Sequence, residues 1–253
     1  MRLIVNADDF GISKAINLGI IEAYNEGIVK STTLMCNMEA VDHAIELANE
    51  NPGIGVGIHF VLTAGKPLAQ GVDSLVDEKG NFLKSEGIEE KAKKDDIRKE
   101  LEGEFNKFLS YGIRPTHIDT HHHVHRIKKV FEVVKEIAIK NNLPVRLMGE
   151  TYDSMYEGIK STSKFSESFY GKEMVTEDNL IRLLEEYKDF ETVEIMSHPG
   201  YLDQNILNRT SYSLERTIEL ETLVSRKVKE YIKENNIELI SFRSEERRVG
   251  KEC

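Results

Sequence analysis

Short runs of strand-forming residues alternate along this chain with longer segments of helical periodicity, and this order restricts the folds it can adopt. The strand-like runs are residues 3–5, 32–35, 54–59, 116–119, 145–147, 193–196 and 239–242. The helical segments between them are residues 13–25, 39–50, 96–111, 128–141, 176–187 and 213–235. Strands that alternate with helices form βαβ units with a parallel sheet. The 253 residues therefore fit one α/β domain, with about seven parallel strands in a barrel or a nearly closed barrel.

Two connections are longer than the loops that usually join neighbouring elements of a compact domain. They span residues 61–94 and 149–175, are rich in Gly and polar residues, and each begins just after a predicted strand. Loops on that side of the strands shape the substrate site of an α/β barrel. We therefore expect both connections to border the functional site.

The charge and composition of the chain exclude several classes of protein. The formal net charge is −10, and acidic and basic residues are interspersed, which argues against a nucleic-acid-binding surface. No stretch approaches the roughly 18 apolar residues of a membrane span, and the apolar run after Met1 is too short for a signal peptide. Cys36 and Cys253 are the only cysteines, so we expect no disulfide framework. The sequence predicts a cytoplasmic protein with neither a membrane nor a nucleic acid as partner.

The segment 243–253 differs in character from the sequence before it. It is highly charged and follows directly on the apolar run at residues 239–242. It also matches the in-frame translation of a common short-read sequencing adapter. We therefore predict that the folded domain covers residues 1–242, and that residues 243–253 are a non-native tail in place of the native sequence after Phe242.

Polar side chains follow four of the predicted strands. Asp8 and Asp9 follow the first strand, His59 closes the third, and His198 follows the strand at residues 193–196. Taken singly, each has an ordinary explanation, because aspartates suit turns and helix N-caps, and a lone histidine is more often a core or turn residue. The carboxyl ends of the strands of a barrel, however, meet at the face that carries the active site. The joint placement of the four clusters therefore favours one functional site.

The densest cluster is residues 116–125, THIDTHHHVH, which holds five of the eight histidines. If the strand continued, its period of two would place His117, Asp119, His121 and His123 on one side. A solvated polar loop is the alternative, but imidazoles beside a carboxylate suit a metal site with supporting hydrogen bonds better. We expect His121 to be a metal ligand, and Asp119 and His123 to orient ligands or to contact the substrate.

A ligand set of one aspartate and two histidines leaves coordination positions open for water and substrate, which is typical of hydrolytic metal sites. The ion would polarise an acyl oxygen and lower the pKa of a bound water. A nearby carboxylate would take the proton of that water, and an imidazole across the site would protonate the leaving amine. Asp8 and His198 fit these two catalytic roles.

Four motifs of this chain, taken in order, resemble those of the YdjC-type carbohydrate deacetylases, a family that includes chitooligosaccharide deacetylases. They are residues 6–11, residues 58–63, residues 116–125 and the pair His198-Pro199. Residues 65–68 and 168–171 also look like family sequence. The resemblance extends from about Met1 to Phe242, which is everything before the suspected tail.

The resemblance implies a distorted TIM-like barrel, often dimeric, that hydrolyses the amide bond of N-acetylated sugars such as chitobiose-type oligosaccharides. It also implies a divalent metal held by His59 and His121, with an aspartate of the Asp8-Asp9 pair, which we take to be Asp9. The family's metal is magnesium, whereas two imidazoles suit zinc, cobalt, iron or manganese better. The sugar substrate can be phosphorylated or not.

Two other functions are open on the sequence alone. A metal-dependent phosphoesterase could use a similar barrel, because metal clusters also serve phosphoryl transfer. A non-catalytic carbohydrate-binding protein could use the metal as a clamp, although binding needs neither a base nor an acid. Arg216, Glu219 and Glu221 in the last helical segment could contact a phosphate or a partner subunit, but we expect a solvated charge pattern there.

Overall fold

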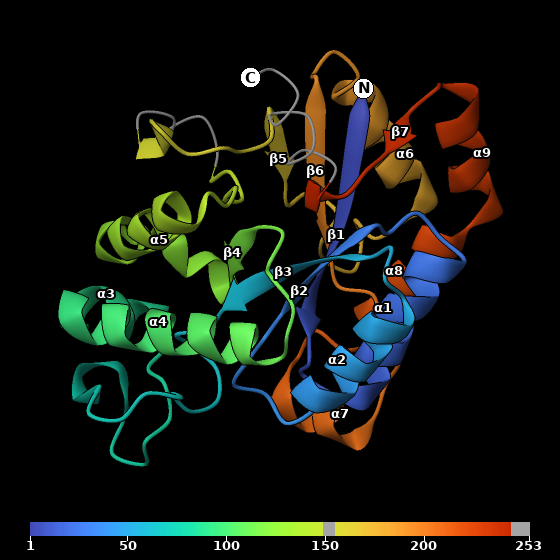
Figure 1. Cartoon of the computed structure of the whole chain (residues 1–253). Coiled ribbons are helices and arrows are strands. Elements are labelled where there is room, and N and C mark those ends of the chain that lie inside the picture. Colours follow the sequence, from blue (N-terminus) through green and yellow to red (C-terminus); the bar gives the residue numbers. More distant parts are fainter. Residues whose placement is uncertain (149–154, 244–253) are drawn as a thin grey trace.

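The computed structural model of this chain describes residues 1–148 and 155–243, and their strands form one parallel sheet that curls into a half-barrel (Figure 1). The strand order is β4-β3-β2-β1-β6-β5, and β7 pairs with the start of β1. The strands are β1 (Arg2–Phe10), β2 (Ser31–Leu34), β3 (Gly55–Phe60), β4 (Ile118–Thr120), β5 (Lys164–Ser166), β6 (Thr192–Ser197) and β7 (Glu238–Leu239). The predicted fold is confirmed: the described residues form an α/β domain of the distorted TIM-like kind.

β1 lies at the centre of the sheet because its sequence suits burial on both faces. It pairs with β6 from Arg2 to Ala7 and with β2 from Asn6 to Phe10. Leu3, Ile4 and Val5 are completely buried, as in strands that are covered on both sides. The polar half of the strand, from Asn6 onward, is buried as well. The apolar half therefore anchors the strand in the core, and the polar half places polar side chains, which are seldom buried, in the interior.

Helices flank the sheet, and Figure 1 shows α3, α4 and α5 together on one side of the view and α1, α2 and α8 on the opposite side. The helices are α1 (Lys14–Asn25), α2 (Val41–Glu50), α3 (Ser85–Lys91), α4 (Lys94–Ser110), α5 (Lys128–Asn141), α6 (Glu177–Glu186), α7 (Gln204–Arg209), α8 (Leu214–Val224) and α9 (Arg226–Glu234), with short 3-10 helices η1 (Asp73–Leu75) and η2 (His121–Arg126). In α5, Val130, Val134 and Ile137 recur at helical spacing and are buried, so one stripe of the helix faces the core.

One predicted strand does not form, and the structure contains one strand that was not predicted. The predicted strand at residues 145–147 is wrong, because Val145 makes only an isolated parallel bridge to Ile118. Pro144 precedes it and has no N–H group to extend a ladder. The strand that the sequence analysis missed is β5, which pairs with β6 at the other edge of the sheet.

The predicted helix at residues 213–235 consists of two helices, α8 and α9. Ser225 leaves helical geometry, with ψ of 137°, and ends α8. Its hydroxyl then accepts the N–H group of Val228 and caps the start of α9. A serine inside a helical pattern was therefore a boundary signal.

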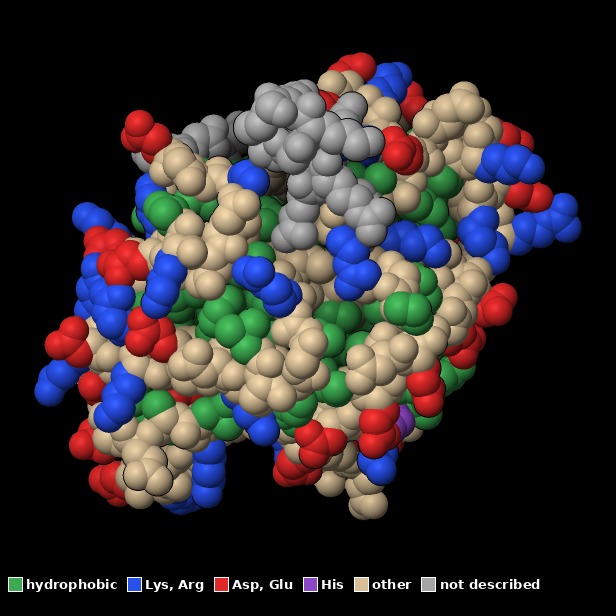
Figure 2. All heavy atoms as spheres, viewed as in Figure 1, with side chains coloured by type: hydrophobic (Ala, Val, Ile, Leu, Met, Phe, Trp, Pro, Cys, Tyr) green, Lys and Arg blue, Asp and Glu red, His purple; other side chains and the backbone are tan. Residues whose placement is uncertain are grey.

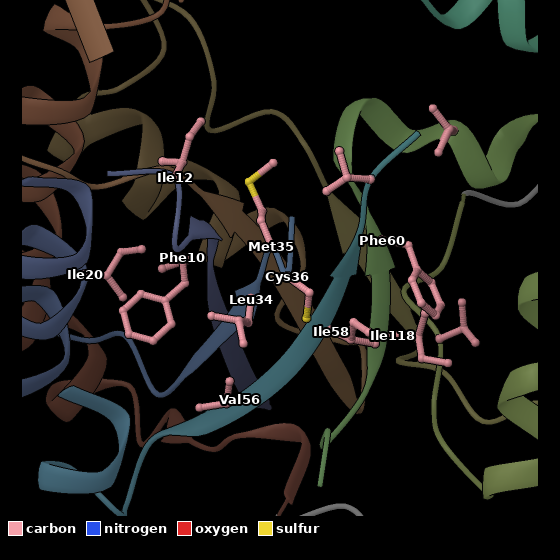
Figure 3. Packing of buried hydrophobic residues seen from close by; sticks show 14 of the residues in the cluster. Phe10, Ile12, Ile20, Leu34, Met35, Cys36, Val56, Ile58, Phe60 and Ile118 are labelled. Carbon is pink, nitrogen blue, oxygen red and sulfur yellow. The ribbon is translucent and has the colours of Figure 1, made fainter. Parts of the chain in front are cut away.

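The hydrophobic core lies between the sheet and its helices. Figure 3 shows Leu34, Ile58 and Ile118 on neighbouring strands, with Phe10 from the end of β1 beside Leu34. Cys36 is a free cysteine in this core. Phe10, Ile58 and Ile118 lie on β1, β3 and β4, which carry predicted functional residues, so the core helps to hold those strands in place.

His117 fills the interior of the half-barrel. It is completely buried, and its ring stacks on that of Phe242 with centroids 3.9 Å apart. A methyl group at Gly57 on β3 would overlap the His117 ring. Phe242 also packs with Ile4 and Ile240. The segment after β7 therefore covers the interior of the half-barrel.

The chain packs as part of the domain as far as Phe242, which is buried. Arg243, the first residue of the predicted non-native tail, donates from Nη1 to the carbonyl of Pro52 at 2.8 Å. Residues 244–253 of that tail, and residues 149–154 of the second long connection, lie outside the described residues. The non-native origin of the tail therefore stays a prediction.

None of the helices that the structure describes is both long and apolar enough to cross a membrane. Acidic and basic side chains are interspersed on the face shown in Figure 2. Mixed charges of this kind are typical of a solvated surface.

Gly57→Ala should destabilise the protein, because the added methyl group would overlap the ring of His117, which is held against Phe242. We expect the free energy of unfolding, measured by urea denaturation, to fall by about 1–3 kcal/mol. Gly103→Ala in α4 is the matched control, because its added Cβ would meet only Ala69, at 3.8 Å. It should stabilise the helix by about 0.5–1 kcal/mol. Effects of the same sign and size at both sites would contradict this packing.

Candidate active site

The two aspartates at the end of β1 reach one site because the strand is irregular there. The register between β1 and β2 shifts at this end, and Asp9 has a φ of 69°, in the left-handed region. In a regular strand, successive side chains point to opposite faces. Here Oδ2 of Asp8 lies 4.0 Å from Nε2 of His198, and Oδ1 of Asp9 lies 3.5 Å from Nε2 of His59. The bulge therefore gives neighbouring carboxylates different partners within the same site.

Asp9, His59 and His121 each present one ligand atom to a common centre. These ligand atoms all lie within 4.8 Å of one another. Oδ1 of Asp9 is 3.1 Å from Nδ1 of His121 and 3.5 Å from Nε2 of His59. Bonds of about 2.1 Å from one ion to two ligands place those ligands roughly 3 Å apart. The three residues predicted as metal ligands therefore fit a divalent ion.

Hydrogen bonds on the far side of the His59 ring aim its Nε2 at this centre. Nδ1 of His59 is 2.7 Å from Oδ1 of Asp119, and the Thr33 hydroxyl donates to Oδ2 of Asp119 at 3.0 Å. An ionised carboxylate only accepts, so Nδ1 carries the proton and Nε2 is available to a metal. Burial lowers the pKa of His59, but Asp119, Asp9 and Asp8 outweigh burial and raise it to about 10. Metal binding must therefore displace a proton from Nε2.

The histidine run leaves β4 and turns instead of continuing as a strand. In η2, φ is 54° at His122 and 51° at His123. The turn places His122 on the cavity wall, where its Nδ1 is 3.0 Å from the Thr63 hydroxyl. It carries His123 away from the centre, and Nε2 of His123 lies 3.2 Å from Glu167. The expected strand alternation therefore does not extend to His121 and His123.

Asp8 is held by Arg146, which the sequence analysis missed. Nη1 and Nη2 of Arg146 donate to the two carboxylate oxygens of Asp8 at 2.7 Å each. The same buried guanidinium lies 2.9 Å from Asp119 and 2.8 Å from Glu194. Burial would raise the pKa of Asp8, but Arg146 outweighs burial and lowers it, so Asp8 stays ionised. The available signal was an arginine inside the apolar run at residues 145–147.

Oδ2 of Asp8 has an acceptor position that no hydrogen bond occupies among the described residues. Oδ1 accepts from Nη2 of Arg146 and from the Asn6 amide at 2.9 Å. Oδ2 accepts from Nη1 of Arg146 and is the oxygen that lies 4.0 Å from Nε2 of His198. Asp8 can therefore accept a proton on the side that faces His198.

α8 contributes two buried ionisable residues to the site. Arg216 is 4% exposed and donates from Nη2 to Oδ2 of Asp9 at 2.5 Å. Glu219 is completely buried, accepts the backbone N–H group of His198, and lies 3.9 Å from its Nδ1. The predicted solvated charge pattern is wrong for both residues, because this face of α8 packs against the site, although Glu221 is exposed. Arg216 and Glu219 are therefore part of the site.

The turn after β6 fixes His198. The N–H group of Gly200 donates to the carbonyl of Arg216 at 3.1 Å, and a side chain at Gly19 in α1 would overlap the backbone of Gly200. Burial lowers the pKa of His198 to about 4, even though Asp9 and Asp8 act to raise it. His198 is therefore uncharged at neutral pH.

Asp9, His121, His198 and Arg216 line a cavity of about 660 Å³. Both long connections border it, which confirms that prediction: residues 63–66 and Asn81 come from the first, and Tyr170 comes from the second. The ring of Tyr170 stacks on that of Tyr212, with centroids 4.1 Å apart, and lies 5.4 Å from that of His198. The cavity thus has an aromatic wall beside the imidazole.

Six of the seven predicted site residues, together with Arg146, belong to one network of contacts of at most 4.0 Å: Asp8, Asp9, His59, Asp119, His121 and His198. The seventh, His123, contacts Glu167 instead. The arrangement can hold a cation at one point, and at another a carboxylate and an imidazole face each other across 4.0 Å. The individual roles stay predictions.

The chain matches one protein family over nearly its whole length. The sequence profile of the family described as YdjC-like protein matches residues 2–234. The chain is 56% identical over 243 residues to a carbohydrate deacetylase of Clostridium beijerinckii, with 96% of this chain and 99% of the relative covered. It is 40% identical over 250 residues to a chitooligosaccharide deacetylase of Salmonella paratyphi B, with 95% and 97% covered. This chain therefore belongs to the YdjC-like family.

Solved structures share the fold. An Enterococcus faecalis protein that is named for cellobiose-phosphate cleavage has a TM-score of 0.93 and 34% identity, with 96% of this chain and 98% of that chain covered. A peptidoglycan N-acetylglucosamine deacetylase has a TM-score of 0.53 and 12% identity, with 96% and 86% covered. At that low identity, the second likeness shows the fold alone.

Asp119→Asn should weaken metal binding, because the amide no longer provides a charged acceptor for Nδ1 of His59. We expect the affinity for Mn²⁺ or Co²⁺, measured by calorimetric titration of the metal-free protein, to fall about 10- to 100-fold. His123→Gln is the control and should keep the wild-type affinity, because His123 contacts Glu167. A loss of similar size in both variants would show that the ligands are assigned incorrectly.

A carboxyl pair on α4 holds the first long connection in place. Glu104 accepts the N–H group of Val61, and Glu100 accepts those of Leu68 and Ala69. Both side chains are completely buried, and their carboxyl groups hydrogen-bond to each other. Burial raises the pKa of Glu104 well above its ordinary value, and the nearby Glu100 raises it further.

Glu104→Gln should remove a loss of stability that the wild-type protein undergoes as the pH rises. Glu104 holds its proton more tightly in the folded chain than in the unfolded chain. Its contribution to the free energy of unfolding is therefore complete below the ordinary pKa of 4.5, and it is lost as the pH rises through the raised pKa of the folded state. Between these values, the wild-type free energy of unfolding should fall relative to the variant by up to about 1.4 kcal/mol per pH unit. Urea denaturation over a pH series measures it.

The matched control is Glu102→Gln, an exposed position on the same helix. Its stability curve should run parallel to that of the wild type. If the curve of Glu104→Gln ran parallel as well, the raised pKa of Glu104 would be refuted.

Proposed function

We propose that this protein is a metal-dependent hydrolase that removes an acetyl group from N-acetylated sugars or short oligosaccharides of the chitobiose type. The observation that carries the proposal is the donor set of Asp9, His59 and His121 at a cavity, with Asp8 and His198 beside it. The two relatives at 56% and 40% identity, which match nearly the whole chain, are named carbohydrate deacetylase and chitooligosaccharide deacetylase. The chemistry of the site and the relationship therefore support the same reaction.

Asp9, His59 and His121 would hold the metal. When bound, the ion would polarise the acyl oxygen of the substrate and lower the pKa of a water. Two imidazoles and one carboxylate favour zinc, cobalt, iron or manganese over magnesium, the metal that the family resemblance implies.

Asp8 is the proposed general base. Arg146 keeps it ionised, and its Oδ2 has a free acceptor position that faces His198. Asp8 would remove a proton from the attacking water as its oxygen forms a bond to the acyl carbon. Arg146 hydrogen-bonds to both oxygens of Asp8 and leaves one acceptor position, on Oδ2, so this carboxylate is better suited to proton transfer than to metal binding.

His198 is the proposed general acid. Because it is uncharged at neutral pH, the proton that it delivers must first reach it during the reaction. Asp8 is the proposed source of that proton; its Oδ2 faces Nε2 of His198 across 4.0 Å, so the proton would pass through one water or reacting group between them. His198 would then protonate the nitrogen as the carbon–nitrogen bond breaks. The products are a free amine, which carries the proton taken from water, and acetic acid, which releases its remaining proton to solvent and becomes acetate.

The cavity suits a small sugar. Its volume of about 660 Å³ lies within the range of roughly 300–1,000 Å³ that is typical of small-molecule sites. The stacked rings of Tyr170 and Tyr212 offer an apolar surface to one face of a sugar ring. Lys66 also lines the cavity, and its positive charge can pair with a phosphate group if the sugar is phosphorylated.

The expected location and assembly rest on the sequence and the resemblance. We propose that the protein is cytoplasmic, that it can form a homodimer, and that its partner is a small N-acetylated saccharide and neither a nucleic acid nor a membrane.

Acetate release from N-acetylated mono- and disaccharides, with metal content measured on the same sample, tests the function. The wild-type protein should release acetate, a chelator should abolish the activity, and an added divalent ion should restore it. Asp8→Asn, His121→Ala and His198→Ala should each lower kcat/KM by at least about 100-fold. Thermal unfolding of each variant checks that it is folded.

Two other outcomes would replace the proposal. Release of phosphate from phosphorylated sugars without acetate would indicate a phosphoesterase. Tight sugar binding without turnover would indicate a carbohydrate-binding protein. Full activity in the folded variants would show that the catalytic roles are assigned incorrectly.

A further inference from the structure

The carboxylate of Asp9 is divided between two partners. Its Oδ1 faces His59 and His121, at 3.5 Å and 3.1 Å. Its Oδ2 accepts a hydrogen bond from Nη2 of Arg216 at 2.5 Å. Arg216 therefore occupies the oxygen that points away from the metal ligands.

The surroundings of Arg216 hold its guanidinium in this position. Nε donates to the carbonyl of Tyr212 at 3.0 Å, and the backbone carbonyl of Arg216 accepts the N–H group of Gly200. Nη1 is buried and has no hydrogen-bond partner among the residues that the structure describes. A buried N–H group without a partner costs free energy of folding. The other hydrogen bonds of Arg216 therefore do not by themselves explain why its guanidinium lies here. The contact with Asp9 does.

The preceding aspartate shows a different arrangement. Arg146 binds both oxygens of Asp8, which leaves neither oxygen wholly free for a metal. Arg216 binds only one oxygen of Asp9. The two arginines therefore distinguish two neighbouring carboxylates, one kept as a base and one kept as a ligand with a single available oxygen.

The number of oxygens that Asp9 offers decides how many coordination positions it fills. A carboxylate can bind an ion through one oxygen or through both. A hydrolytic site needs positions that are left open for water and substrate. A second oxygen of Asp9 on the ion would fill one of them.

We propose that Arg216 is a positioning residue that restricts Asp9 to coordination through one oxygen and so keeps a position on the metal open. This inference rests on the metal-dependent hydrolysis proposed above. In an Arg216→Gln protein, both oxygens of Asp9 become available, so the ion is bound as well as before while its open position is filled.

Co²⁺ is the probe, because the intensity and position of its visible absorption bands report coordination number and geometry. Titration of metal-free Arg216→Gln with Co²⁺ should give an affinity equal to or higher than that of the wild type, and a spectrum of higher coordination number. Turnover measured on the same samples should show kcat for acetate release reduced about 10- to 100-fold, with a smaller change in KM. Arg209→Gln is the matched control, because Arg209 lies on the same cavity wall but pairs with Glu39, and its Co²⁺ spectrum should be unchanged.

An unchanged Co²⁺ spectrum in folded Arg216→Gln would overturn the proposal, whatever the affinity. If this variant does not fold, Arg216→Lys decides, because the contact with Asp9 involves one nitrogen, which an ammonium can replace. It should keep the wild-type spectrum, and an altered spectrum would overturn the proposal. The Co²⁺ binding measurements need no substrate, so they can be interpreted separately from the activity. A wild-type protein that binds Co²⁺ but releases no acetate would refute the proposed function. The Co²⁺ spectra would then still decide the role of Arg216.

Discussion

The buried guanidinium of Arg146 is the interaction on which the rest of the site depends. It lies among Asp8 on β1, Asp119 on β4 and Glu194 on β6, and so joins three strands of the half-barrel. Removing one partner from a buried ion pair costs about 3–5 kcal/mol, because the other charge is left uncompensated. Burial, with help from the two aspartates, raises the pKa of Glu194 to about 7, so this third carboxyl is partly protonated at neutral pH. That proton limits the excess of negative charge around one arginine.

The parallel sheet brings the remaining groups to the same place. β1, β3, β4 and β6 all run in one direction, so the residues at or just after their carboxyl ends lie along one edge. Asp9, His59 and His121 arrive there from three different segments, and His198 arrives from a fourth. Asp119 links the cluster of Asp9, His59 and His121 to Arg146, since one of its oxygens contacts His59 and the other contacts the guanidinium. The orientation of the His59 ring and the ionisation of Asp8 therefore depend on one connected set of charges.

The predictable part of this site had local signals in the chain. Asp8, Asp9, His59 and His198 stand at the ends of apolar strand-like runs, and residues 116–125 are dense in imidazole. The partners of two other residues could not be read from the neighbouring sequence. Arg146 is 138 residues from Asp8, and Arg216 is 207 residues from Asp9. A charged residue in an apolar run or on a mixed helix can be solvated or buried, and only the packing of distant segments decides between these outcomes.

The sequence by itself determined the alternation of strands and helices, the parallel sheet that follows from it, and the chemistry of the residues at the strand ends. These follow from periodicity and composition, which act over a few neighbouring residues. Only the tertiary structure decided that β1 bulges at Asp9, that His123 turns away while His122 reaches the cavity, and that Arg216 and Glu219 are buried. Each of these depends on backbone conformation or on burial against segments far away in the chain, where the cost of an unpaired buried charge selects the partner.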